Sequence, residues 1–136
     1  WSSDVCSSDL QMDTENLLEC YVNLKREMET YMKYLDAWDK KVAIWGASHQ
    51  GFTLAATTKL GEKARYIIDS APFKQGKFAP ASHLPIVGPD HFHEHPVDAI
   101  IITAPGYTDE IAASIRQKFG TAVEIRAMRS NHLEMV

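Results

Sequence analysis

An apolar segment that runs directly into a glycine-bearing turn is the feature that most constrains this chain. Residues 42–51 read VAIWGASHQG, a stretch of helical pattern follows, and a second apolar segment ends at Asp69. A strand, a glycine turn, a helix and a second strand with a terminal carboxylate form the first half of a Rossmann-type unit. Such a turn sets free backbone N–H groups of a helix N-terminus beside a strand end. The segment therefore predicts a place where an anionic group can bind.

Strand and helix patterns alternate through the rest of the chain. Gly61 and Gly120 are expected to end the two main helices, and Thr108 to cap the second one. Residues 70–85, which contain three prolines, are expected to form a long loop. We expect an α/β fold, a Rossmann-like three-layer sandwich with a mostly parallel sheet. The expected strands are 42–45, 65–69, 86–87, 97–104 and 123–128; the expected helices are 51–60 and 108–119, with one or two helical turns in 89–94.

A long helix is expected to precede this sheet, over residues 14–39. Its apolar side chains recur at alternating steps of four and three residues, which places them on one stripe. The stripe fits a helix that packs on its own or a neighbouring domain, and it also fits the seam of a coiled-coil dimer. Its members are Leu17, Tyr21, Leu24, Met28, Tyr31, Leu35 and Trp38.

The first ten residues, WSSDVCSSDL, resemble one reading frame of a common sequencing adapter. We treat residues 1–10 as a non-native leader, 11–40 as a connector helix and 41–136 as the domain proper. Without the leader, Cys20 is the only cysteine, so an internal disulfide is excluded and a reducing, cytoplasmic location is expected. The missing initiator Met adds to the expectation of a truncated start.

Charge and hydropathy exclude two classes of partner. The net charge of −4 gives no general attraction to nucleic acid or to an anionic membrane. The longest apolar run, Ala99–Ala104 with Thr103 inside it, is far shorter than a membrane span. We therefore expect neither nucleic acid nor a membrane as a partner.

The turn itself matches the dinucleotide fingerprint only in part. Gly46, Ser48 and Gly51 occupy its three glycine positions, and Asp69 stands where such folds place their ribose-binding acid. A side chain at Ser48 would crowd a pyrophosphate, although its hydroxyl can bond a phosphate oxygen. Two interpretations remain open: a ligand site, in which His49 is a further contact, or a domain that keeps the architecture and binds nothing here.

The loop after Asp69 carries two lysines close to the predicted carboxyl edge of the sheet. Lys74 can meet a phosphate as a point charge. Alternatively, Lys74 and Lys77 are both solvated, while Phe73 and Phe78 pin the loop.

An alternating histidine triplet, His91, His93 and His95, lies between Pro89 and Pro96. On an extended segment the three imidazoles would share a face and could hold zinc. The flanking prolines and the helix-like pattern favour a surface turn instead, so no metal site is expected. No nucleophile–base pair and no pair of catalytic acids is readable, and we expect no catalytic residue in this chain.

Several of these motifs together resemble the C-terminal domain of SAM-dependent C-methyltransferases, a family that includes enzymes acting on nucleotide-linked deoxysugars. The resemblance covers about residues 41–128. It departs from the usual pattern at Ser48 and Ala81, which are commonly Gly, and at 104–107. The matching segments are VAIWGASHQG (42–51), IID (67–69), PFKQG (72–76), Pro80, HLPI (83–86) and YTDEI (107–111).

In that family a zinc-binding module and a SAM-binding domain come first. The resemblance therefore implies a fragment that contributes to substrate binding, with no cofactor of its own. SAM, the catalytic base and the partner domain would lie upstream in the same chain, and the substrate would be a nucleotide-linked sugar. An independent module that binds NAD(P) or a nucleotide sugar remains the alternative. The implied substrate-binding residues are Gly46, Ser48, His49, Gln50, Gly51, Asp69, Lys74 and Tyr107.

Overall fold

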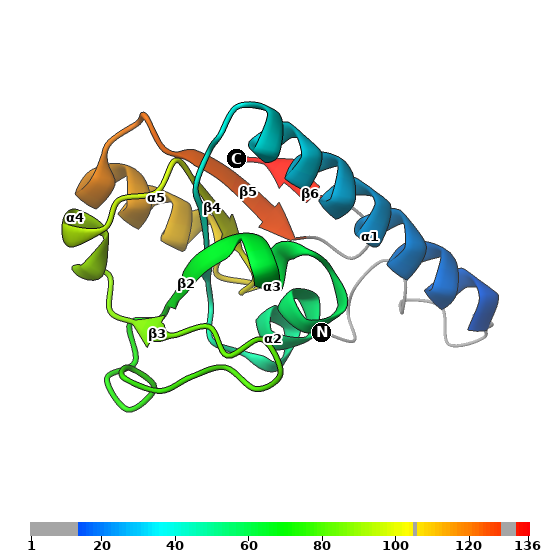
Figure 1. Cartoon of the computed structure of the whole chain (residues 1–136), viewed down its shortest axis with the longest axis horizontal. Helices are drawn as coiled ribbons and strands as arrows, with labels where there is room; N and C mark the ends of the chain where they lie inside the picture. Colours follow the sequence, from blue (N-terminus) through cyan, green and yellow to red (C-terminus); the bar gives the residue numbers. More distant parts are fainter. Residues whose placement is uncertain (1–13, 105, 129–132) are drawn as a thin grey trace.

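The computed structural model describes residues 14–104, 106–128 and 133–136, except for the side chains of 14–21 and 50. It shows a six-stranded sheet with helices on both faces (Figure 1). The strands are β1 (Val42–Trp45), β2 (Ala64–Ile68), β3 (Ile86–Val87), β4 (Ala99–Ile102), β5 (Glu124–Met128) and β6 (Leu133–Met135). The helices are α1 (Thr14–Ala37), α2 (His49–Thr57), α3 (Leu60–Lys63), α4 (His91–Glu94) and α5 (Thr108–Phe119).

The strand order is β3-β2-β1-β4-β5-β6, and the first five strands run parallel. The chain builds outwards from β1 through β2 to β3 and then crosses to β4 on the other side of β1. The strand order therefore reverses between β1 and β4, which is where open α/β sheets bind ligands. The expected α/β fold with a mostly parallel sheet is confirmed.

Two apolar clusters cover the two faces of the sheet and make three layers. On one face, Met28 and Leu35 of α1 pack with Leu54 of α2 and with Leu60 of α3. The other face is covered by α4 and α5, through buried side chains such as Ile115. All four residues of β4 are buried, as expected for a central strand that is covered on both faces.

Helix α1 packs on its own domain through the predicted stripe. Met28, Tyr31 and Leu35 are all buried against this face of the sheet. Trp38 is 68% exposed, because α1 ends at Ala37 and the stripe ends with it. The stripe residues in 28–35 therefore pack within the chain. Because they already contact the sheet, they are not available as the seam of a coiled coil.

Polar contacts also tie α1 to the far edge of the sheet. Lys40, just after the helix, pairs with Glu124 of β5 at 3.0 Å. The Glu124 carboxylate also accepts a hydrogen bond from the Tyr34 hydroxyl at 3.3 Å. Glu27 of α1 accepts the backbone N–H of Leu133 at 2.7 Å. The helix is thus held by apolar and polar contacts to the sheet that it covers.

Several predicted element boundaries were wrong. The single helix expected over 51–60 is two helices, because the Thr58 hydroxyl bonds the Leu54 carbonyl and accepts the Leu60 N–H. Gly61 therefore lies inside α3, where a Cβ atom would come within 2.3 Å of the Ala55 carbonyl oxygen.

The strand expected over 97–104 is shorter, as β4 (Ala99–Ile102), and the strand expected over 65–69 begins and ends one residue earlier, as β2 (Ala64–Ile68). Further differences concern the second half of the chain. Tyr107, not Thr108, is the N-cap residue of α5, and no side chain caps that end. The antiparallel edge strand β6 was not predicted. Gly120 ends α5 with a φ of 89°, as expected. The predicted leader 1–10 lies outside the described residues. In the described part of the chain, no helix combines the length and apolar character needed to cross a bilayer.

Candidate functional site

The glycine turn lies at the carboxyl end of β1, directly at the reversal point of the sheet. Gly46 adopts a φ of 127°, and its N–H donates to the Ile68 carbonyl at 2.8 Å. A Cβ atom at Gly46 would lie 2.7 Å from the Thr103 hydroxyl, and one at Gly51 would lie 2.6 Å from the Gly46 carbonyl oxygen. Both glycines are therefore required by close packing within the turn, whether or not a ligand is bound.

Ser48, at the middle glycine position, is the N-cap residue of α2. Its backbone is extended, and its hydroxyl oxygen accepts the Gly51 N–H at 3.4 Å. The hydroxyl thus satisfies one of the helix N–H groups that a phosphate would otherwise take. His49 begins α2 and is exposed, whereas the side chain of Gln50 lies outside the described residues.

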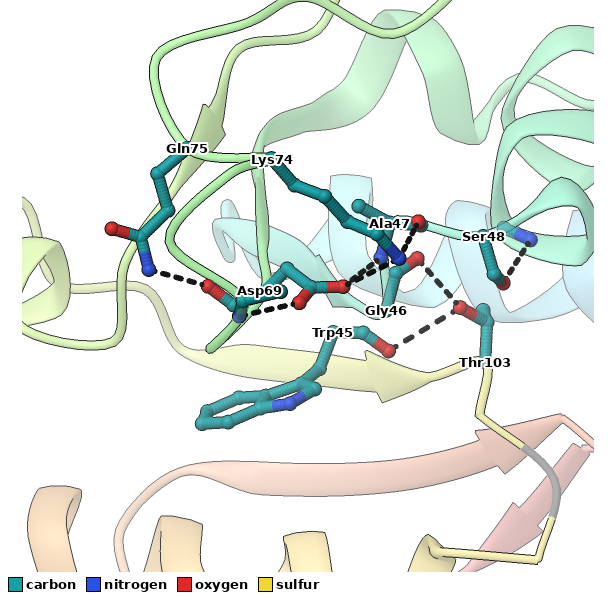
Figure 2. A network of polar contacts seen from close by, with 10 residues as sticks. Trp45, Gly46, Ala47, Ser48, Asp69, Lys74, Gln75 and Thr103 are labelled. Atoms are coloured by element: carbon teal, nitrogen blue, oxygen red, sulfur yellow. Dashed lines mark hydrogen bonds and ion pairs between the residues drawn. The ribbon is translucent and has the colours of Figure 1, made fainter.

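Both carboxylate oxygens of Asp69 accept hydrogen bonds from backbone groups of the protein (Figure 2). One carboxylate oxygen accepts the Ala47 N–H at 2.9 Å and the other accepts the Ala71 N–H at 2.8 Å. The Lys74 ammonium lies 3.7 Å from the same carboxylate and donates to the Ala47 carbonyl at 2.9 Å. We call Ala47, Asp69, Ala71 and Lys74 the turn latch, because they fasten the loop after β2 to the glycine turn.

Gln75 extends the latch on its other side. Its side-chain amide donates to the Asp69 carbonyl at 2.9 Å. The same side chain packs against Gly88, where an added Cβ atom would lie 3.1 Å from the Gln75 Nε2 atom. Phe73 and Phe78 are 71% and 68% exposed, so the prediction that they pin the loop is wrong. Hydrogen bonds from Lys74 and Gln75 hold the loop instead. Of the two lysines for which solvation was the alternative, Lys77 is exposed, whereas Lys74 is partly buried and bonded.

A pocket of about 350 Å³ opens beside the latch, between the ends of β1 and β4 and one side of α5 from its first turn to its last. We call it the carboxyl-edge pocket. It brings together three predicted residues, Gly46, Asp69 and Tyr107, whereas Ser48, His49, Gly51 and Lys74 do not line it. Its lining is Trp45, Gly46, Asp69, Ser70, Pro89, Ala104, Tyr107, Glu110, Ile111, Ser114 and Lys118.

Comparison with known proteins gives the chain its family. Residues 14–124 match the family model described as the C-methyltransferase C-terminal domain. The chain belongs to this family. It is 37% identical over 73 residues to the C-methyltransferase NovU of Streptomyces niveus, a match that covers 53% of this chain and 17% of NovU. The chain thus matches less than a fifth of the length of that relative.

A solved structure supports the fold of this C-methyltransferase domain. UDP-D-quinovosamine 4-dehydrogenase from Vibrio fischeri superposes with a TM-score of 0.55 at 19% identity. The superposition covers 71% of this chain and 93% of the matched chain. At this identity the likeness concerns the α/β architecture alone.

The C-methyltransferase domain has pocket residues that the sequence analysis missed. Glu110, Ser114 and Lys118 all line the carboxyl-edge pocket. Their spacing of four residues on the predicted helix was the available signal, since such residues share one helix face. Thr103 was also missed; its buried hydroxyl donates to the Trp45 and Gly46 carbonyls at 3.3 and 3.2 Å.

The pocket can bind a polar ligand but does not fit a dinucleotide at the glycine turn. A ribose diol would have to share the Asp69 carboxylate with two backbone N–H groups and an ammonium. A pyrophosphate would meet the side chain of Ser48 at the position that usually holds glycine.

The histidine triplet forms a helical turn, as favoured by its flanking prolines. His91 and His93 lie in α4, and the rings of His91 and His95 are 4.9 Å apart. Within the described ranges, no three His, Cys, Asp or Glu side chains are grouped in a way that could hold a metal ion.

Proposed function

We propose that this C-methyltransferase C-terminal domain is the substrate-side domain of a SAM-dependent enzyme that methylates a nucleotide-linked sugar. The family match places it as a C-terminal domain, which implies an upstream domain in the same chain. In the proposal, that upstream domain supplies SAM and the catalytic base. The resemblance to sugar-modifying members of the family supports the choice of substrate class.

The observation that carries the proposal is the carboxyl-edge pocket at the reversal point of the sheet. Tyr107 is 62% exposed at its mouth, and Trp45 forms part of its wall with only 6% exposure. Sugar hydroxyls both donate and accept hydrogen bonds, so a sugar site needs donors and acceptors. Aromatic rings can pack against the apolar faces of sugars and bases. Glu110, Ser114 and Lys118 supply an acceptor, a hydroxyl and a cation along one face of α5.

In this function the predicted turn residues act by positioning the pocket. Gly46 and Asp69 form its wall, and Lys74 holds Asp69 and the Ala47 carbonyl in place from outside the pocket. Tyr107 is the predicted residue best placed to touch substrate. None of these groups forms a nucleophile–base pair in the described lining, so the chemistry is assigned to the upstream domain.

An independent nucleotide-binding module is the second candidate function. Gly46, Gly51 and the position of Asp69 favour it, because they match the dinucleotide fingerprint. The internal bonds of Asp69 and the capping role of Ser48 oppose it. Titration calorimetry of the 136-residue chain with NAD(H), NADP(H) and nucleotide sugars separates the two functions. Tight binding of a dinucleotide would establish the second function and overturn the first.

The natural reading frame provides the matching genetic test. We expect the sequence upstream of residue 11 to encode a glycine motif of a SAM-binding domain. The longer protein should then transfer a methyl group from SAM to a carbon of a nucleotide-linked sugar. An upstream frame without such a motif would contradict the proposed function.

A further inference from the structure

We propose that this domain has a second ligand site, a phosphate-binding pocket at the opposite edge of the sheet. The pocket has a volume of about 410 Å³ and lies where the strands begin. We call it the amino-edge pocket. Its lining is Lys41, Arg65, Tyr66, His91, Glu94, His95 and Pro96.

Its place in the fold makes it independent of the carboxyl-edge pocket. Lys41 directly precedes β1, and Arg65 is the second residue of β2. Gly46 and Asp69 follow the other ends of the same two parallel strands. The two pockets therefore lie at opposite ends of β1 and β2, and they share no lining residue.

The exposed arginine lies at an irregularity in the sheet. Val42 pairs with Ala64 and Ile44 pairs with Ile67, so β2 has one more residue than β1 over this stretch. Arg65 is exposed although its neighbours Ala64 and Tyr66 are buried. Bulges of this kind re-aim a side chain, and they often occur beside functional sites. Here Arg65 lies within the irregular stretch and lines the pocket.

The two cations of this pocket lack the ion pairs that their neighbours have. Lys40 pairs with Glu124, and Lys63 pairs with Asp36. Neither Lys41 nor Arg65 pairs with any carboxylate in the described part of the chain.

Several carboxylates limit this positive charge. Asp39 and Glu62 line a neighbouring hollow that Lys41 and Arg65 also border. Glu94 is the one that lines the pocket. Asp98 accepts the backbone N–H of Lys41 at 2.8 Å. In the lining of the amino-edge pocket itself, Lys41 and Arg65 outnumber the single carboxylate of Glu94, and this local excess of positive charge suits an anionic ligand.

Buried Tyr66 holds the two histidines that line the pocket, His91 and His95. Its hydroxyl donates to the His95 carbonyl at 2.6 Å, and its ring meets His91 edge-on at 4.8 Å between centroids. The guanidinium of Arg65 can donate two parallel hydrogen bonds, the Lys41 ammonium adds a positive charge, and the histidine imidazoles add further N–H donors. These groups together match the oxygens of a phosphate. We infer that the ligand is a phosphomonoester or diphosphate group.

The test is an NMR titration of the ¹⁵N-labelled 136-residue chain with inorganic pyrophosphate, at constant ionic strength. We expect saturable shifts at the amides of Lys41, Arg65 and His95, with little change at 46–51 and 107–118. Arg65→Gln should weaken binding about tenfold, the effect of losing a bidentate charged contact. Glu94→Gln should tighten binding about twofold, because it removes the opposing charge.

Lys77→Gln is the matched control, since Lys77 is exposed, lines neither pocket and carries the same charge. Equal weakening by Arg65→Gln and Lys77→Gln would overturn the proposal, because it would show attraction by net charge alone. Shifts confined to 46–51, or no shift at ~10 mM pyrophosphate, would also overturn it. None of these outcomes depends on the proposed methyltransferase function, whose readouts are methyl transfer and binding at the other edge.

Discussion

The carboxylate of Asp69 accepts the backbone N–H of Ala47 at 2.9 Å, which joins the end of β2 to the turn after β1. In a dinucleotide-binding fold the acid at this position faces a ribose. Here the same acid holds the turn, and Lys74 holds the acid. The latch thus keeps the Rossmann geometry, but its internal bonds use the Asp69 carboxylate that a dinucleotide would need for its ribose.

The first prediction concerns the strength of this latch. Asp69→Asn leaves at least one backbone N–H with a weaker or absent acceptor and leaves Lys74 without its counter-charge. We expect it to lower the free energy of unfolding by about 1–3 kcal/mol. Urea denaturation measures the change.

Lysine substitutions in the same loop provide the control. Lys74→Met should be destabilising because it removes the bond to the Ala47 carbonyl, whereas Lys77→Met should change stability by less than about 0.5 kcal/mol. If Asp69→Asn or Lys74→Met proves as mild as Lys77→Met, the latch does not hold the turn.

The second prediction concerns Ser48 as a helix cap. Ser48→Ala removes the acceptor of the Gly51 N–H and should cost about 0.5–1 kcal/mol, the lower part of the range for N-caps because the bond is long at 3.4 Å. Ser48→Gly should cost only a few tenths of a kcal/mol. Thermal melts of both variants measure these changes.

Ser48→Gly also restores the glycine that the fingerprint lacks. We expect it to confer no NAD(H) affinity, since Asp69 remains bonded to Ala47, Ala71 and Lys74. Dinucleotide binding by this variant would show that Ser48 alone blocks the site.

The third prediction concerns Tyr31, whose buried hydroxyl has no hydrogen-bond partner among the described residues. Burial, and secondarily Glu124, raises the pKa of Tyr31 from its ordinary value near 10 to about 12, although the interaction of the Arg126 guanidinium with the hydroxyl and its positive charge oppose this shift. An unsatisfied buried hydroxyl is unfavourable, so Tyr31→Phe should stabilise the domain by up to about 1 kcal/mol at neutral pH.

The pH dependence of this effect has a definite sign. Between pH 10 and 12 the unfolded chain loses the Tyr31 proton while the folded domain keeps it, so stability falls as pH rises through this window. The advantage of Tyr31→Phe over the natural sequence should therefore grow above pH 10. Urea midpoints of both proteins at pH 8 and pH 10.5 measure it, and an advantage that shrinks with pH would contradict the raised pKa.

The sequence was sufficient to predict the five parallel strands, but not the edge strand β6 or the roles of the site residues. Apolar runs and glycine positions predicted β1 and β3 to the residue, because buried parallel strands have a strong local pattern. The split between α2 and α3 depends on the bonds of one threonine hydroxyl, and the close approach of Gly61 to Ala55 appears only in the folded chain.

The role of Asp69 depends on contacts that spacing does not reveal. Its position matched a ribose-binding acid, but its partners are set by a loop that folds back so that Lys74 and Gln75 reach the strand end. A positive φ at Gly76 permits the loop to turn and the Gly76 N–H to bond the Ile86 carbonyl. Long-range hydrogen bonds of this kind have no signature in residue types alone.

The most direct test of the central claim is the effect of Tyr107→Ala on the longer protein that is proposed above to be a methyltransferase. Tyr107 is exposed at the mouth of the carboxyl-edge pocket, and removing it should take away a contact with the acceptor but none with SAM. We expect the KM for the nucleotide-sugar acceptor to rise about tenfold, equivalent to about 1.4 kcal/mol of binding, while the KM for SAM stays unchanged. An unchanged acceptor KM together with full activity would contradict the assignment of this domain to the substrate side.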